Sequence, residues 1–155
     1  GIRVSELINL KLSQVKDEYI LIHGKGDKER VVPKSPLLNK WMFKYLSTRE
    51  NFFAYRRVPE NVFLSRNGRP MTTEAIHRVI KIAGKAVGVS KDIRVSPHTC
   101  RHTFAQMQLK NGLDLYSLSR LMGHSNISIT QRYLEGLRDF EVLNACKATG
   151  ILMNL

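Results

Sequence analysis

The sequence predicts one domain that is mainly α with a small antiparallel β-hairpin sheet, which places it in the α+β class. Apolar residues recur at helical spacing through several segments of the chain. Two runs rich in strand-forming residues, 18–23 and 29–33, flank a Gly-Lys-Gly-Asp turn. Residues that typically begin or end helices, such as Ser96 before Pro97 and later Gly123, separate the helical segments. A length of 155 residues suits a single domain with an ordinary core.

The first half of the chain is expected to combine short helices with the hairpin. Apolar spacing predicts a helix at 4–10 before the first strand. After the second strand, Pro36 can open a helix over 37–46. The mixed, basic segment 47–60 is expected to be an irregular surface loop, and 62–64 a short strand.

The second half is expected to be helical throughout. Thr72 or Thr73 caps a helix that runs to about residue 87. Asp114 can cap a later helix that Gly123 stops. The further helices predicted from spacing and caps are 98–110, 115–122, 127–134 and 139–148. An apolar tail, 151–155, completes the chain.

The chain carries a strong positive charge. Its 25 Lys and Arg residues against 13 Asp and Glu give a formal net charge of +12 and a pI of about 10.1. Such an excess favours a polyanion, most often nucleic acid, because each neutralised phosphate releases condensed counterions. A solvated basic surface or ribosomal-type RNA binding would give a similar composition.

Several absences narrow the cellular setting. The two cysteines, Cys100 and Cys146, form neither a disulfide framework nor a CxxC metal motif. No apolar run approaches about 20 residues, and the N-terminus lacks the layout of a signal peptide. We therefore expect a cytoplasmic protein with no membrane partner. The start at Gly1, without an initiator Met, predicts a fragment of a longer protein.

A C-terminal group of side chains has the chemistry of phosphodiester cleavage. Cleavage without a metal needs a nucleophile, cations around the non-bridging oxygens and an acid for the leaving oxygen. Tyr133 offers the nucleophile, and Arg101 with His98 and His124 offers the cations. Lysines upstream offer the acid. This combination indicates DNA strand cleavage through a phosphotyrosine.

Plainer explanations exist for the same residues. His98 and Arg101 lie at i and i+3, so they share a helix face, and a helix N-terminus favours an anion. An HxxR pattern nevertheless arises often by chance, and a helix cap beside an exposed arginine would explain it. Tyr133 has apolar neighbours, so it could be a core residue. The chain has five tyrosines, and composition does not choose among them.

A zinc site is the main chemical alternative at the histidines. His98 and His102 lie at i and i+4, and His124 follows. The HExxH arrangement needs a glutamate after the first histidine, where this chain has Thr99. Arg101 would also lie next to any bound cation. The sequence therefore predicts no metal site, and His102 can be explained as a buried, hydrogen-bonded side chain.

Charged residues in the N-terminal third add candidates. Arg3 and Glu6 share a helix face, and a surface salt bridge worth a few tenths of a kcal/mol would account for them. Lys25, between two glycines at the hairpin tip, can protonate a leaving 5′-oxygen or simply contact phosphate. Lys28 and Arg30 are expected to be DNA-binding phosphate contacts.

Taken together, these motifs resemble the catalytic domain of the tyrosine recombinases, the phage-integrase family that includes Xer recombinases and mobile-element integrases. The matching segments follow the family's order and cover nearly the whole chain. The tyrosine lies nine positions after the last histidine, as in the family. The segments are Gly1-Ile2-Arg3-Val4-Ser5-Glu6-Leu7, Gly24-Lys25-Gly26-Asp27-Lys28-Glu29-Arg30-Val31-Val32-Pro33, His98-Thr99-Cys100-Arg101-His102-Thr103-Phe104, Leu121-Met122-Gly123-His124 and Tyr133. Any single segment is a weak signal, but five in order are a strong one.

The resemblance implies the fold of a tyrosine recombinase or type IB topoisomerase-like catalytic domain over residues 1–155. It also implies that the family's N-terminal core-binding domain, which closes around DNA, is absent from this chain. The side chains implied to surround the scissile phosphate are Arg3, Lys25, His98, Arg101 and His124. Tyr133 would attack the phosphate, and Glu6 would orient the arginines. The products would be a 3′-phosphotyrosyl bond and a free 5′-hydroxyl, formed without ATP, metal or another cofactor.

The activity implied by the resemblance is site-specific recombination, by integration or excision, on double-stranded DNA. The resemblance also implies that the protein is bacterial or phage-encoded. The family assembles as a homo-oligomer, a tetramer on DNA, whereas an isolated fragment could be a monomer. Residues 140–155 are expected either to dock on a neighbouring subunit or to pack on their own domain. Two rival functions remain: type IB topoisomerase-like relaxation of DNA, and DNA binding without catalysis.

Overall fold

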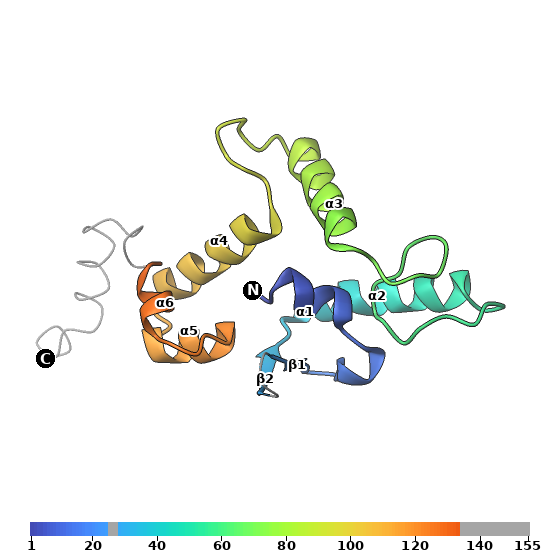
Figure 1. The fold of residues 1–155 in the computed structure, drawn as a ribbon, viewed down its shortest axis with the longest axis horizontal. Helices are drawn as coiled ribbons and strands as arrows, with labels where there is room; N and C mark the ends of the chain where they lie inside the picture. Colours follow the sequence, from blue (N-terminus) through green and yellow to red (C-terminus); the bar gives the residue numbers. More distant parts are fainter. Residues whose placement is uncertain (25–27, 134–155) are drawn as a thin grey trace, which may run out of the picture. The chain divides into compact units, whose positions relative to one another are not determined.

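The computed structural model describes residues 1–24 and 28–133. These residues are mostly helical and contain one two-stranded antiparallel sheet, which confirms the predicted fold class (Figure 1). The contacts divide the chain into two compact units, Ile2–Pro97 and a second unit formed by Gly1 with the residues from His98 onward. The predicted helix at 139–148 and the apolar tail at 151–155 lie outside the described residues.

The first unit contains four helical segments and the hairpin. In chain order these are α1 (Val4–Asn9), the 3-10 helix η1 (Leu12–Gln14), β1 (Tyr19–His23), β2 (Glu29–Pro33), α2 (Pro36–Phe52) and α3 (Thr73–Ala86). Helices α2 and α3 begin at capping side chains, because a helix leaves its first backbone N–H groups without internal partners. Ser35 accepts a hydrogen bond at the start of α2, and Thr72, rather than Thr73, does so for α3.

The hairpin turns one face toward the core of this unit. Ile20 pairs with Val32 and Ile22 pairs with Arg30 across the antiparallel ladder. Ile20 and Ile22 are buried, and because side chains alternate along a strand, their partners Val32 and Arg30 lie on the same face. The buried residues that form the core of the unit are Leu10, Ile20, Ile22, Met42 and Val62.

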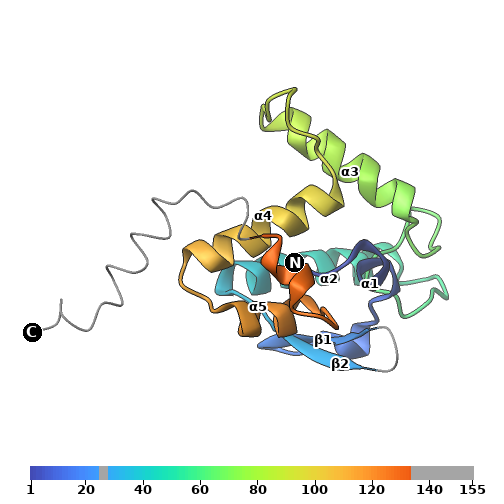
Figure 2. The same cartoon turned by 60° about the vertical axis from the view of Figure 1, so that its left-hand side comes forward.

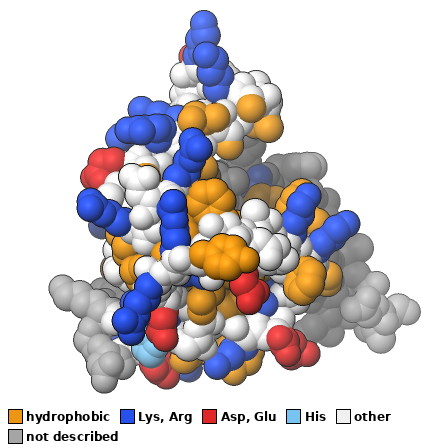
Figure 3. Space-filling model, turned by 90° about the vertical axis from the view of Figure 1, so that its right-hand side faces the viewer, with side chains coloured by type: hydrophobic (Ala, Val, Ile, Leu, Met, Phe, Trp, Pro, Cys, Tyr) orange, Lys and Arg blue, Asp and Glu red, His pale blue; other side chains and the backbone are white. Residues whose placement is uncertain are grey.

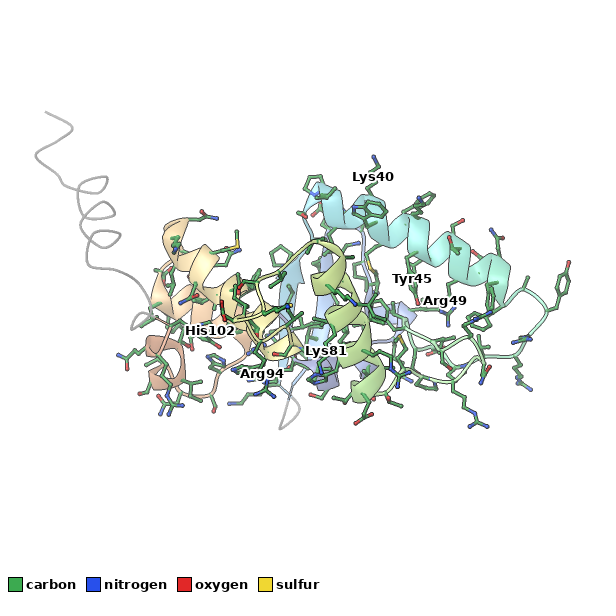
Figure 4. All side chains as sticks on the ribbon, turned by 90° about the horizontal axis from the view of Figure 1, so that it is seen from above. Lys40, Tyr45, Arg49, Lys81, Arg94 and His102 are labelled. Carbon is green, nitrogen blue, oxygen red and sulfur yellow. The ribbon has the colours of Figure 1, made fainter. Side chains whose placement is uncertain are left out.

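Helix α2 is longer than predicted, because residues 47–52 continue the helix instead of forming a loop. Tyr45 donates a hydrogen bond to the carbonyl of Val62, and Arg49 donates to the carbonyls of Pro59 and Asn61 in the loop that follows α2. Figure 4 shows Tyr45 and Arg49 on the same side of α2, away from Lys40. These anchors hold the polar last turns of α2, which apolar spacing alone does not reveal.

The predicted strand at 62–64 is wrong. The structure has only single bridges in this region, Lys11 with Asn61 and Leu64 with Pro70. A strand needs a partner along several residues, and neither bridge extends into a ladder. Val62 is nevertheless fully buried, so its apolar character indicated burial rather than strand structure.

The second unit is helical in its described part. It contains α4 (Pro97–Lys110), α5 (Leu115–Met122) and α6 (Ser128–Gln131), with α5 and α6 next to each other (Figure 2). Gly123 ends α5 in the left-handed conformation, with φ of +66°. The predicted bounds of α4 and α5 are confirmed to within one residue. The buried residues of this core are Ala105, Leu118, Met122 and Tyr133.

Helix α6 is shorter than the predicted helix at 127–134. The N–H of Thr130 donates to the carbonyl of Ile127, and the N–H of Tyr133 donates to the carbonyl of Thr130. Both bonds span three residues, the spacing of a 3-10 turn rather than of a continuing α-helix. The N–H of Gln131 does donate four residues back, to the carbonyl of Ile127, but the bond from Tyr133 shows that the α-helix does not continue to it. Tyr133 therefore follows the helix instead of lying within it.

The surface displays the positive charge of the composition. Lys and Arg side chains project at many points on the face drawn in Figure 3, with hydrophobic side chains between them. In the described part of the chain, no helix is both long and apolar enough to cross a membrane.

Candidate active site

Arg101 and His124 are in direct contact in the second unit. Arg101 is buried, with 8% of its surface exposed, although it belongs to the first two turns of α4. One terminal nitrogen, Nη2, donates to the carbonyl of Met122 at 2.7 Å and lies 3.1 Å from Nε2 of His124. The other terminal nitrogen donates to the carbonyl of Gly1. The guanidinium is therefore held in one orientation by groups on both sides of it.

Tyr133 packs beside the same histidine. Its ring lies parallel to that of His124, with an interplanar angle of 11° and 6.1 Å between centroids. The ring of His102 is tilted by 50° against that of Tyr133, with 5.1 Å between centroids. Tyr133 is 8% exposed, whereas Tyr116 in the same unit is 61% exposed. Tyr133 is therefore buried, as the plainer explanation of a core residue requires. Among the described tyrosines, it is also the one whose ring contacts histidine rings.

The other predicted histidine, His98, is exposed in the first turn of α4. His102 is only partly buried, with its ring against that of Tyr133, and the hydrogen bond expected for it stays a prediction. In the range 1–24 and 28–133, no three His, Cys, Asp or Glu residues are grouped as metal ligands would be.

Arg3, Glu6 and Arg30 form a second cluster, in the first unit. The carboxylate of Glu6 accepts two hydrogen bonds from the guanidinium of Arg30, at 2.9 and 2.7 Å. It also accepts from the backbone N–H of Arg3 at 2.7 Å and from the Arg3 side chain at 3.0 Å. The Glu6 side chain is only 7% exposed, so this is not the simple surface salt bridge that would explain an i,i+3 pair.

The environment of Glu6 stabilises its charged form. Burial would raise the pKa of this carboxyl, but hydrogen bonds from Arg30 and from the Arg3 backbone, with the Arg30 charge, lower the pKa to about 2. Arg3 keeps 38% of its side chain exposed, so Glu6 fixes the guanidinium while leaving part of it open to solvent. An arginine held in this way can present a prepared fork to a phosphate.

Arg30 reaches Glu6 because of the strand register. It lies opposite the buried Ile22, so its side chain leaves the hairpin on the core-facing side, and it is 10% exposed. Val31, next to it, points the other way and is 53% exposed. The expected contact of Arg30 with DNA stays a prediction. In the structure the guanidinium of Arg30 is bound to Glu6. Lys28 is exposed, as a phosphate contact would need to be, and Lys25 lies outside the described residues.

Two contacts of the candidate site were not predicted from the sequence. Thr130 is completely buried, and its hydroxyl oxygen lies 2.8 Å from Nδ1 of His124. A polar residue three positions before Tyr133 was a possible signal, but it has no meaning until the fold brings it to the histidine. The bond between Arg30 and Glu6 joins residues 24 positions apart, and strand alternation could have indicated only that Arg30 faces inward.

Replacing Glu6 by glutamine tests the first cluster. We expect Glu6→Gln to lower the free energy of unfolding by about 1–3 kcal/mol, because two arginines lose their charged acceptor. The folded-state pKa lies below the ordinary value of 4.5, so the stabilisation is complete above pH 4.5 and is lost as pH falls through about 2. Urea unfolding at several pH values between 7 and 2.5 measures this.

The matched control is Glu50→Gln, at an exposed position near the end of α2. The gap in stability between wild type and Glu6→Gln should narrow steadily below pH 4.5, whereas Glu50→Gln should follow wild type at every pH. A gap for Glu6→Gln that stays the same from pH 7 to 2.5 would show that the charge of Glu6 does not stabilise the fold.

Residues 1–138 match the model of the phage integrase family. The chain is 42% identical over 135 residues to the tyrosine recombinase XerD of Lacticaseibacillus casei, which covers 86% of this chain and 45% of that protein. It is 39% identical over 135 residues to XerD of Staphylococcus aureus strain N315, with the same coverage. The chain thus spans a little less than half the length of these curated relatives.

Solved structures of recombinases share the fold of this chain. The crystal structure of XerA recombinase superposes with a TM-score of 0.82 at 33% identity, covering 97% of this chain and 54% of that one. A post-cleavage complex of XerH recombinase with a palindromic difH substrate superposes with a TM-score of 0.76 at 22% identity, covering 98% of this chain and 42% of that one. The clusters around Arg101 and Glu6 therefore belong to a member of the phage integrase family of tyrosine recombinases.

Proposed function

We propose that this chain is the catalytic part of a site-specific DNA recombinase, which cuts and rejoins strands through a 3′-phosphotyrosyl intermediate. The observation that carries the proposal is the placement of Tyr133 against His124, whose Nε2 is in contact with Arg101. A tyrosine, a histidine and a fixed arginine are the groups that attack on a phosphodiester requires. Family membership supports the same chemistry.

The proposed roles follow from the side chains. Tyr133 attacks the phosphorus and displaces the 5′-oxygen, so one phosphoester bond forms as another breaks. Arg101 and Arg3 bind the non-bridging oxygens, because a guanidinium fork matches phosphate geometry. His98 and His124 add donors to the same charge, and Glu6 keeps Arg3 in place.

Protonation of the leaving oxygen is assigned to Lys25, as the sequence predicts. The freed 5′-hydroxyl of a partner strand then attacks the phosphotyrosine, which restores a phosphodiester and releases Tyr133. The bond energy is conserved in the intermediate, so the steps balance without ATP or a metal ion. Exchange between two DNA sites requires at least two active sites at once. The proposal therefore includes assembly on DNA as a homo-oligomer. It places this reaction in the cytoplasm.

A covalent capture experiment tests this function. The complete protein is mixed with a library of nicked synthetic DNA duplexes of randomised sequence, in which the short fragment next to the nick diffuses away after cleavage and traps the intermediate. Denaturing gels should show a protein–DNA adduct, and sequencing of the captured strands should return a preferred site. Absence of any adduct at every protein and salt concentration tested would contradict the proposal.

The same material separates the rival functions. A type IB topoisomerase would relax a supercoiled plasmid that lacks the captured site and would not recombine two copies of it. A DNA-binding domain without catalysis would retain duplexes but form no adduct. A recombinase should join two plasmid-borne copies of the site into the products expected from strand exchange.

A further inference from the structure

Thr130 links the two groups that the proposed reaction needs close together. It is fully buried, and its hydroxyl oxygen lies 2.8 Å from Nδ1 of His124. Its backbone carbonyl accepts the N–H of Tyr133 at 3.0 Å. A buried hydroxyl without a partner is costly, so a polar residue at this position calls for a reason beyond packing. One residue thus holds the ring of the histidine and the backbone of the tyrosine.

The contacts of His124 determine which of its nitrogens carries the proton. Nη2 of Arg101 lies 3.1 Å from Nε2, and a guanidinium can only donate hydrogen bonds. A hydrogen bond across this distance requires Nε2 to be the acceptor, without a hydrogen of its own. The proton of the neutral ring is then on Nδ1, which donates to the hydroxyl oxygen of Thr130. The ring is fixed between a donor on one side and an acceptor on the other.

We propose that Thr130 is a positioning residue for strand cleavage. Its hydroxyl holds His124 in the Nδ1–H tautomer, in which Nε2 accepts a hydrogen bond from the guanidinium of Arg101. The inference rests on the proposed function, because it takes Arg101 and Tyr133 as reacting groups. The same hydroxyl oxygen remains a suitable acceptor when Nε2 gains a proton and donates to a phosphate oxygen. Thr130 therefore supports His124 in the DNA-free protein and on DNA alike.

Two substitutions distinguish a positioning role of Thr130 from a role in packing alone. Valine has nearly the shape of threonine, and it would fill the same buried space without the hydroxyl. Serine keeps the hydroxyl and loses the methyl group. Thr130→Val thus tests the hydrogen bond, and Thr130→Ser tests the packing, at one position and with single-atom changes.

The experiment uses the complete protein with each variant and two readouts. The first readout uses a nicked suicide duplex of the sequence that covalent capture returns. We follow its cleavage in single turnover and measure the Kd of each variant for the same duplex. In metal sites, removing the partner that fixes a histidine's tautomer costs about 10- to 100-fold in activity. We expect a loss of this size in the cleavage rate for Thr130→Val, with Kd within about twofold of wild type and recovery of the rate in Thr130→Ser.

The second readout needs no DNA. In protein with ¹⁵N-labelled histidine, the ring nitrogens of His124, assigned by their loss in His124→Gln, should show the Nδ1–H tautomer in wild type and in Thr130→Ser. Thr130→Val should shift them toward a mixture of tautomers. A wild-type cleavage rate in Thr130→Val, a loss that serine does not restore, or an Nε2–H tautomer in wild type would each overturn the proposal. If wild type forms no adduct, the proposed function fails, and the tautomer measurement still decides the contact between Thr130 and His124.

Discussion

Tyr133→Phe is expected to abolish the covalent protein–DNA adduct completely while leaving DNA binding nearly unchanged. Phenylalanine keeps the ring that packs against His102 and His124 but has no oxygen to form a phosphoester. Without a nucleophile no other interaction in the site can produce the intermediate. Adduct formation on the captured site, and Kd for the same duplex, are measured side by side.

Tyr116→Phe is the matched control for this result. Tyr116 lies on α5 in the same unit, but it is 61% exposed and its hydroxyl accepts from Arg120. The control should form adduct at the wild-type rate. Persistent adduct in Tyr133→Phe, or its loss in Tyr116→Phe, would show that the nucleophile has been assigned to the wrong tyrosine.

Arg101→Ala is expected to have the second largest effect, a loss of about 10²–10³-fold in cleavage rate with a much smaller change in binding. Arg101 is held by Met122 and His124 before any substrate arrives, so it requires little reorganisation when charge develops on the phosphate. Because alanine also leaves a buried carbonyl unpaired, Arg101→Lys is made in parallel. Lysine keeps the charge but not the fork, so cleavage should stay impaired.

Lys28→Ala separates catalysis from attraction to DNA. Lys28 is exposed on the hairpin, and its loss should weaken binding to all sequences and reduce the salt slope by about one ion. Cleavage of duplex that is already bound should be almost unaffected. Small and equal effects of Arg101→Ala and Lys28→Ala on the rate of bound cleavage would contradict the division between these roles, and thermal melting identifies any variant that has unfolded.

Local signals predicted most of the fold. The bounds of α4 and α5 follow from a proline at N1 and from caps at Asp114 and Gly123, which act within one turn of the helix. The hairpin follows from two strand-forming runs around a glycine-rich turn. The end of α2 was predicted too early, because its last turns are polar and are held by Arg49 through carbonyls of the following loop.

The candidate site was predicted as a set of residue types and not as a set of contacts. Resemblance to the family identified Arg101, His124 and Tyr133, which the structure does bring together. It did not reveal that Arg30 holds Glu6, because that bond depends on strand register. Nor did it reveal Thr130, whose hydroxyl reaches Nδ1 of His124 only through the fold of the turn between them. Contacts of this kind arise only when the chain is folded.

Peptide mapping of the captured adduct tests the central claim most directly. Trypsin cleaves after Arg132 and Arg138, so a tyrosine that carries nucleotide at position 133 lies on the peptide 133–138. After digestion of the DNA to a short remnant, mass spectrometry should find the added nucleotide mass on this peptide and fragment ions should place it on Tyr133. The same mass on a peptide that contains Tyr116, or on any residue other than tyrosine, would contradict the mechanism proposed for this protein.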